Sequence, residues 1–305
     1  MPWSLLGMLL WPTLASVVLA LAAWFVLRGG IPPLRAGRLT TAVAAGIAVV
    51  VTVIDTVLGA AALWFEALRD LSSALFEARF VLPLVLALPI IVLFGALCPR
   101  TAAPSGALLA PRSWHSFVRA RWLLAAFCAL ALIVGLTLAA GMASEPNDAG
   151  EYVMYRVDVG SMEMGTTIYG WHHSLVPLVL CALLCAVTWW ALSRIARPPM
   201  AAEHAADTAD RRLRSTNAVR VALGALLLLL EAVLHSLANT SRMTGSASDG
   251  DVWFSTGTPF AALTGMLSVL AQAAGVLGLA LWVLTVLTAV RAPSSARATS
   301  TAVPS

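Results

Sequence analysis

Residues 214–237, RSTNAVRVALGALLLLLEAVLHSL, form an apolar run long enough to cross a bilayer, and the carboxylate of Glu231 lies inside it. A hydrocarbon core about 30 Å thick is crossed by about 20 apolar residues in a helix. Acids are rare within such spans because burying their charge costs free energy, so an intramembrane acid marks a functional site by default. Glu231 is therefore the first candidate functional residue of the chain.

A second run, residues 38–58, RLTTAVAAGIAVVVTVIDTVL, repeats this pattern. Arginine, Ala-Val, an acid and Val-Leu stand at the same offsets in both runs, so Asp55 matches Glu231. Upstream of each run, a tryptophan, an arginine and a Pro-Pro pair also match without a gap, starting at Trp24 and Trp190. These matches predict an internal duplication.

The predicted repeat has a 3+1+3 arrangement of spans, with halves at about residues 1–100 and 171–291 and a linking span at 122–143. Because an odd number of spans separates the halves, both cross the membrane in the same sense, about an axis along its normal. Chance agreement is the alternative, since Ala-Val and Val-Leu pairs are frequent in so apolar a chain and Trp and Arg favour membrane interfaces.

Composition places the whole chain in the class of polytopic, all-α membrane proteins. Apolar residues make up 60% of the 305 positions and charged residues only 11%, whereas soluble domains carry about 25% charged residues. The mean hydropathy is +0.87. The net charge of +4 comes from arginines in short loops, which orient helices and imply no nucleic-acid partner.

Apolar periods predict a transmembrane domain over residues 1–290 and a disordered cytoplasmic tail at 291–305. The tail is rich in Ser, Ala, Pro and Thr, a composition typical of disorder. The predicted spans are seven helices at residues 3–27, 39–64, 80–97, 122–143, 175–192, 218–237 and 259–290.

The arginines predict the orientation of these spans. Fifteen of the 19 basic residues fall in segments that alternate spans place on one side, and four (Arg69, Arg79, Arg156 and Arg242) fall on the other. Positively charged loops stay in the cytoplasm. We therefore expect a multi-pass protein of the cytoplasmic (inner) membrane with its N-terminus outside and its C-terminus in the cytoplasm.

Two segments on the arginine-poor side have local patterns of their own. Residues 65–79 place leucines on one helical face and charges on the other, which predicts a short helix in the membrane interface. The acidic outer loop, residues 144–173, alternates Val153, Tyr155 and Val157 with polar residues before Gly160. This alternation predicts a small extracytoplasmic β-hairpin.

The candidate binding residues gather in the outer half of the bundle. Asp55 and Glu231 each precede about six more residues of their span, which places them at a similar depth. An ionised carboxylate in hydrocarbon is costly, so each acid is expected to hold a proton unless a cation or water pairs with it. Further polar groups predicted to line an outward-opening cavity are His235, Gln272, His172 and His173.

The composition leaves several functions open. The first is a permease-like protein that binds a small solute, cation or proton at these residues. The second is a non-catalytic membrane subunit, for example the partner of a transport ATPase, in which the acids only link helices. The third is copper binding by Met162, Met164, His172 and His173, because thioethers and imidazoles suit copper(I).

Catalytic classes find little support in the sequence. The chain has no lysine, and no phosphate-binding loop, nucleophile elbow or His-Glu-x-x-His motif occurs in it. We therefore expect a protein that is not an enzyme and that needs no cofactor.

Overall fold

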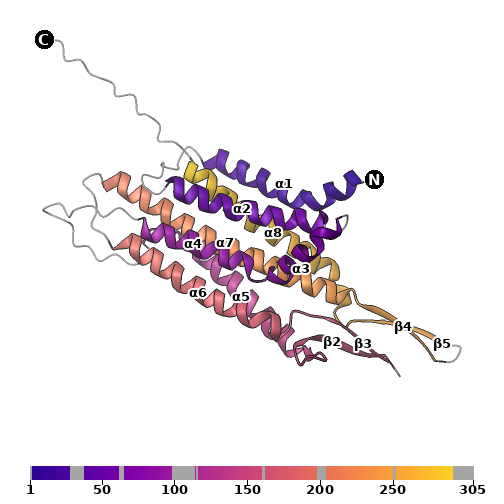
Figure 1. Cartoon of the computed structure of the whole chain (residues 1–305). Helices are drawn as coiled ribbons and strands as arrows, with labels where there is room; N and C mark the ends of the chain where they lie inside the picture. Colours follow the sequence, from indigo (N-terminus) through magenta and orange to yellow (C-terminus); the bar gives the residue numbers. More distant parts are fainter. Residues whose placement is uncertain are drawn as a thin grey trace, which may run out of the picture.

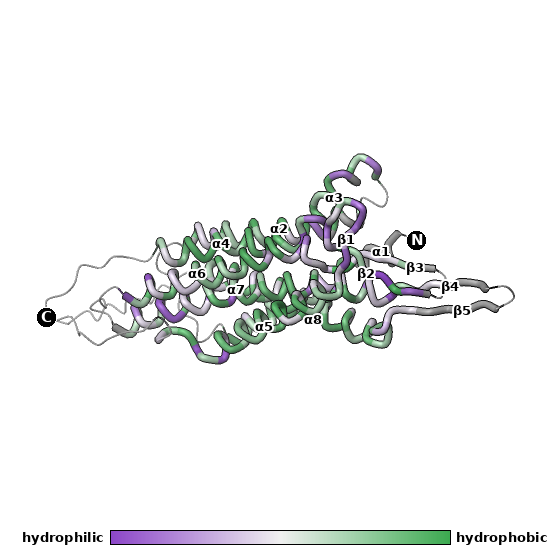
Figure 2. Tube along the Cα trace, turned by 90° about the horizontal axis from the view of Figure 1, so that it is seen from below, coloured by the Kyte–Doolittle hydropathy of each residue, from purple (hydrophilic) through white to green (hydrophobic). Residues whose placement is uncertain are grey.

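The computed structural model describes residues 2–27, 38–61, 65–97, 114, 116–159, 162–197, 204–249 and 252–290. Its long helices run side by side, and the strands gather at one end of the bundle (Figure 1). Apolar residues cover the middle of the helices, and hydrophilic residues concentrate toward both ends (Figure 2). The predicted tail, residues 291–305, lies outside the described residues.

The helices alternate in direction between the strand end and the opposite end (Figure 1). We call the opposite end the arginine end, because it holds the described residues Arg119, Arg121, Arg194, Arg197, Arg211, Arg212 and Arg214. The helices are α1 (Pro2–Leu27), α2 (Arg38–Ala61), α3 (Arg69–Ala78), α4 (Leu82–Ala96), α5 (Ala120–Met142), α6 (Trp171–Ala196), α7 (His204–Ser241) and α8 (Thr264–Val290), with short 3-10 turns η1 (Glu66–Leu68) and η2 (Ala261–Leu263). The strands are β1 (Glu145–Pro146), β2 (Tyr152–Val159), β3 (Met162–Thr167), β4 (Thr244–Asp249) and β5 (Val252–Gly257).

The prediction of a helical, multi-pass membrane protein is supported. Within the described ranges, five helices are long and apolar enough to cross a membrane: α1, α5, α6, α7 and α8. A sixth span results if α3 and α4, which meet at a bend of 69°, count together. Each of the seven predicted spans overlaps a helix in its described residues, but the apolar part of α2 is short, Leu39–Asp55, so seven spans are not confirmed.

Helix α7 lies at the centre of the bundle. Of its apolar window 78% is buried inside the protein, against 11% for α1 and 22% for α5. Helices α4, α5, α6 and α8 all pack on α7. The outer helices therefore present apolar side chains outward, such as Val18, Phe127 and Val179, as expected for lipid-facing surfaces.

Glycines allow α7 and α8 to pack closely. A Cβ atom built at Gly278 would lie 2.9 Å from the carbonyl oxygen of Gly224, and one built at Gly224 would lie 2.5 Å from the ring of Trp282. The indole of Trp282 fills this space and donates a hydrogen bond of 3.1 Å to the carbonyl of Val221. The small residues of α8 thus serve a helix contact within the chain.

Helix α7 begins much earlier than the predicted span. The span was predicted at residues 218–237, but residues 204–217 are helical as well. At 1.5 Å per residue the 38 residues of α7 extend about 57 Å, beyond the roughly 30 Å of hydrocarbon. Its first turns therefore project past the apolar layer at the arginine end.

Ion pairs one helical turn apart explain this extension. Asp207 pairs with Arg211 at 3.0 Å and Asp210 with Arg214 at 2.8 Å. The two arginines also donate to the carbonyls of Ile195, in the last turn of α6, and of Leu97, directly after α4, each at 2.9 Å. These donors satisfy carbonyls that helix ends leave free.

The helices pack in pairs that correspond under the predicted repeat. Helix α1 packs on α8 as α6 packs on α4, and α2 packs on α8 as α7 packs on α4. These contacts are related if α1 corresponds to α6, α2 to α7 and α4 to α8. The contact between α7 and α8 is nevertheless far more extensive than that between α2 and α4, and the duplication itself stays a prediction.

The predicted hairpin is present, and a second one was missed. Strands β2 and β3 pair antiparallel, with Val157 opposite Met164, and β1 adds to this sheet. Strands β4 and β5 form another antiparallel pair, between the sixth and seventh predicted spans, where no hairpin was predicted. Met164 packs directly against Gly245, so the two hairpins lie in contact.

The close packing of α7 and α8 makes Gly278 sensitive to the smallest side chain. Because a Cβ there meets backbone of α7, we expect Gly278→Ala to lower the free energy of unfolding by about 1–3 kcal/mol, as overpacking does. Gly265→Ala is the matched control, since nothing lies within 4 Å of a Cβ on Gly265. Thermal unfolding in detergent measures both, and equal midpoints for the two variants would contradict the packing.

Candidate functional site

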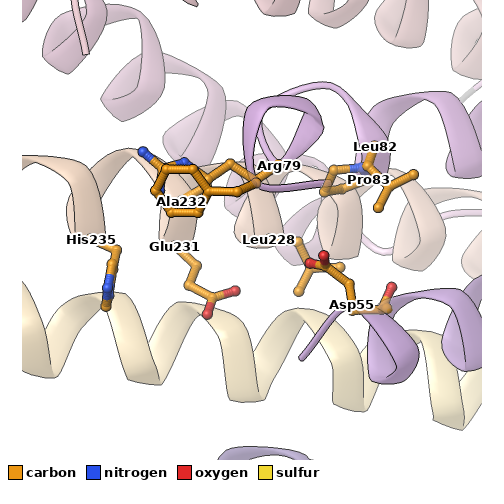
Figure 3. A pocket seen from close by; sticks show the side chains of 10 residues that line it. Asp55, Arg79, Leu82, Pro83, Leu228, Glu231, Ala232 and His235 are labelled. Atoms are coloured by element: carbon orange, nitrogen blue, oxygen red, sulfur yellow. The ribbon is translucent and has the colours of Figure 1, made fainter. Parts of the chain in front are cut away.

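Asp55 and Glu231 line one cavity toward the strand end of the bundle. The cavity has a volume of about 240 Å³ and lies between α2, the α3–α4 bend and α7. Figure 3 shows Asp55, Glu231 and His235 along one side of it, with Arg79 across from them. Its lining residues are Thr52, Asp55, Phe76, Arg79, Leu82, Pro83, Leu228, Glu231, Ala232 and His235.

A glycine of α8 makes room for the carboxyl group of Glu231. A Cβ atom on Gly275 would lie 2.6 Å from Cδ of Glu231 and 2.8 Å from its Oε2. Any side chain at this position would displace the carboxyl group. Because Gly275 has no side chain, the half-buried carboxyl group of Glu231 fits between α7 and α8.

Arg79 brings a positive charge into the cavity. It lies between α3 and α4, where the chain bends, with its guanidinium 3.7 Å from the ring centroid of Phe76 and 4.6 Å from that of Phe80. Its Nε is buried and has no hydrogen-bond partner. Asp55 lies within electrostatic range of both Arg79 and Glu231, although no ion pair joins Arg79 to either acid among the described residues.

The charges of the cavity do not balance when both acids are ionised. Two carboxylates face one guanidinium, and the imidazole of His235 is uncharged in its ordinary form near neutral pH. One carboxylate can be compensated by Arg79, while the other must be compensated by a proton, a cation or water. The arrangement can therefore hold one exchangeable positive charge.

The other predicted site residues lie outside this cavity. Gln272 is exposed on α8 and does not line it. His172, at the start of α6, lies 3.8 Å from a carboxylate oxygen of Glu151. The ring of His173 packs against Phe80, with 5.8 Å between centroids. The structure thus brings together Asp55, Glu231 and His235, and leaves the other three apart from them.

The copper hypothesis gains no support from the described residues. In this part of the chain no group of three or more His, Cys, Asp or Glu side chains is placed to hold a metal ion. Met164 packs on the neighbouring hairpin, and the side chain of Met162 lies outside the described residues.

Sequence reasoning missed Arg79 as a partner of the acids. It was counted only as one of four arginines on the arginine-poor side. A signal was available, because Arg79 directly precedes an apolar run and has Phe76 and Phe80 near it. An arginine with aromatic neighbours at the edge of a span is typical of a cation held partly out of water.

Comparisons of the chain with models of protein families, with curated proteins and with solved structures find no match. The function is therefore inferred from the site itself.

Removal of the Arg79 guanidinium should change the protonation state of Asp55 and Glu231. In Arg79→Leu neither carboxylate has a positive partner, so both are expected to take up protons. Dicyclohexylcarbodiimide modifies protonated carboxyl groups in apolar surroundings, so mass spectrometry should find severalfold more adduct on Asp55 and Glu231.

Arg242→Leu serves as the control for this measurement. Arg242 follows α7 at the same end, and its side chain donates to the hydroxyl of Ser268 at 3.2 Å. It lies within electrostatic range of His235 but, unlike Arg79, acts on neither acid among the described residues. Labelling that is the same in Arg79→Leu as in the unaltered protein would contradict the electrostatic coupling of Arg79 to the acids.

Proposed function

We propose that this chain is a permease-like integral membrane protein whose cavity between α2, α4 and α7 binds and releases a proton or a small cation. One observation carries the proposal: two carboxylates and one guanidinium line the same cavity. A site that serves only to link helices has no need for an unbalanced acid, because a neutral amide links them as well.

The protonation state of Asp55 and Glu231 would control the binding of a cation. With Arg79 neutralising one acid, the second acid alternates between a protonated form and an ionised form that attracts a cation. The two acids interact, so they titrate as a pair and binding depends on pH through both. Proton and cation would compete for one charge, which is the property that couples their movements.

The size of the cavity favours a small occupant. Its volume of about 240 Å³ lies below the 300–1,000 Å³ typical of sites for larger organic ligands. An ion with part of its hydration shell or a solute of a few heavy atoms fits this space. Thr52 adds a hydroxyl, which can contribute an oxygen to a bound cation.

The paired helix contacts support the 3+1+3 repeat with seven spans. Under the exchange of α2 with α7, Asp55 and Glu231 are equivalent, and both reach the same cavity. A parallel repeat of this kind places its binding site at the interface of the two halves. The linking helix α5 does not line the cavity; it packs against α7 and α6.

The same proposal includes the orientation in the membrane. Helices α1, α4, α6 and α8 run toward the arginine end, and α2, α5 and α7 run away from it (Figure 1). Seven crossings with the arginine end in the cytoplasm put the strands and the acid cavity toward the outside.

Fusions of truncated chains to reporters test this topology. A fluorescent protein fused after Arg112 or Met200 should be active, and alkaline phosphatase fused after Gly160 or Gly250 should be active, because each reporter works on one side of the membrane. A reversed result at either pair of positions would exclude the proposed orientation.

Neutral variants of the acids test transport. Asp55→Asn and Glu231→Gln keep shape and hydrogen-bonding capacity but lose the exchangeable charge. In proteoliposomes with an internal pH-sensitive dye, an imposed Na⁺ or K⁺ gradient should change the internal pH with the unaltered protein and leave it unchanged with either variant.

Glu163→Gln is the matched control, because this acid is exposed on the hairpin, where it pairs with Arg156. It should transport as the unaltered protein does. If all forms behave alike and the neutral variants change only thermal stability, by about 0.6–2 kcal/mol, the acids only link helices. Purification with a stoichiometric partner would then favour the subunit hypothesis.

A further inference from the structure

A second cluster of charge lies at the arginine end, between α5 and α7, and it is wholly positive. Arg220 of α7 is only 6% exposed. Arg119 directly precedes α5 and Arg121 lies in its first turn, both exposed and both within electrostatic range of Arg220. Trp122 lies among them, its ring centroid 5.2 Å from the guanidinium carbon of Arg220 and 5.8 Å from that of Arg121.

Arg220 is held in place but not neutralised. Its Nη1 donates to Oδ1 of Asn217 at 3.1 Å, and the amide of Asn217 donates to the hydroxyl of Thr288 on α8 at 2.9 Å. Its Nε is buried without a hydrogen-bond partner. No carboxylate pairs with it in the part of the chain that the structure describes.

The neighbouring arginines of α7 show the contrast. Arg211 and Arg214 each have an aspartate four residues earlier, whereas the corresponding neighbour of Arg220 is Thr216. Residues 98–122 contain four arginines and no acid. The acids of α7 thus lie elsewhere, Asp207 and Asp210 with Arg211 and Arg214 and Glu231 in the acid cavity, and no acid of the described residues pairs with this cluster.

Three guanidinium groups in one place repel one another, and burial of Arg220 adds the cost of an uncompensated charge. Both costs are removed by an anion that accepts several hydrogen bonds at once. Phosphate groups fit this description, since the planar guanidinium binds their oxygens in bidentate fashion. The first turn of α5 adds free backbone N–H groups, which also favour an anion.

We propose that Arg119, Arg121 and Arg220, with Trp122, form a binding site for a phosphate-bearing anion between α5 and α7. The site lies where α5 enters the apolar layer, at the level where lipid headgroups meet water, so the phosphate of an anionic phospholipid reaches it directly. Free phosphate offers the same chemistry. The site is separate from the acid cavity and does not depend on its function.

Binding is measured on the purified full-length chain in nanodiscs, by native mass spectrometry and thermal unfolding. Phosphatidylglycerol should remain bound and raise the unfolding temperature relative to phosphatidylcholine alone. Arg121→Gln and Arg119→Gln, both exposed and safe for folding, should each weaken retention of phosphatidylglycerol, and Arg220→Gln should weaken it about tenfold. Arg212→Gln is the control, because Arg212 is exposed on α7 at the same end.

Addition of inorganic phosphate to nanodiscs of phosphatidylcholine distinguishes the two sources. Stabilisation that is lost in Arg121→Gln identifies free phosphate as a ligand, and stabilisation by phosphatidylglycerol alone identifies the lipid. If neither anion stabilises the protein, or if Arg212→Gln weakens binding as much as the three site variants do, the proposal is wrong.

Discussion

Burial of charge in an apolar bundle is costly, and the structure depends on the groups that surround the buried charges of α7. Near the start of α7, Arg211 and Arg214 are paired with aspartates and with the carbonyls at the ends of α6 and α4. Farther along, Glu231 shares a cavity with Asp55 and Arg79. These polar contacts fix α4 and α6 against α7, which apolar packing alone does poorly in lipid, where helices gain no hydrophobic free energy by associating.

Much of the fold could be predicted from local pattern. The apolar runs gave every long helix, and the alternation of Val153, Tyr155 and Val157 gave the first hairpin. The start of α7 was missed because charged residues in a short connection look like a loop, although the four-residue spacing of Asp207 and Arg211 indicates a helix. The hairpin β4–β5 was missed because small polar residues such as Gly245 and Ser246 lack a clear alternation.

The sequence could predict how deep in the membrane the site residues lie, but not which face of each helix is turned toward the site. Counting residues along each span placed Asp55 and Glu231 at a similar depth, and these two acids do line one cavity. Ala271 lies on the buried face of α8. Gln272, the next residue, points away from that face and is exposed. Which face a helix buries is decided by its neighbours, and so is the approach of Arg79 from a different segment. No pattern within one span contains that information.

The packing around Glu231 links the charge of the cavity to the contact between α7 and α8. The carboxyl group lies against Gly275, one turn from Gly278, where the backbones of α7 and α8 pack closely. Helix α2, which carries Asp55, packs on α8, while α4 packs on α7. Asp55 is thus held by the α2–α8 contact and Arg79 lies beside the α4–α7 contact, so a change of charge at the acids acts on both helix pairs. Ionisation changes the hydration and the room that a carboxyl group needs. Under the proposed function, uptake or release of a proton or cation would therefore alter the packing of the bundle at the α7–α8 contact.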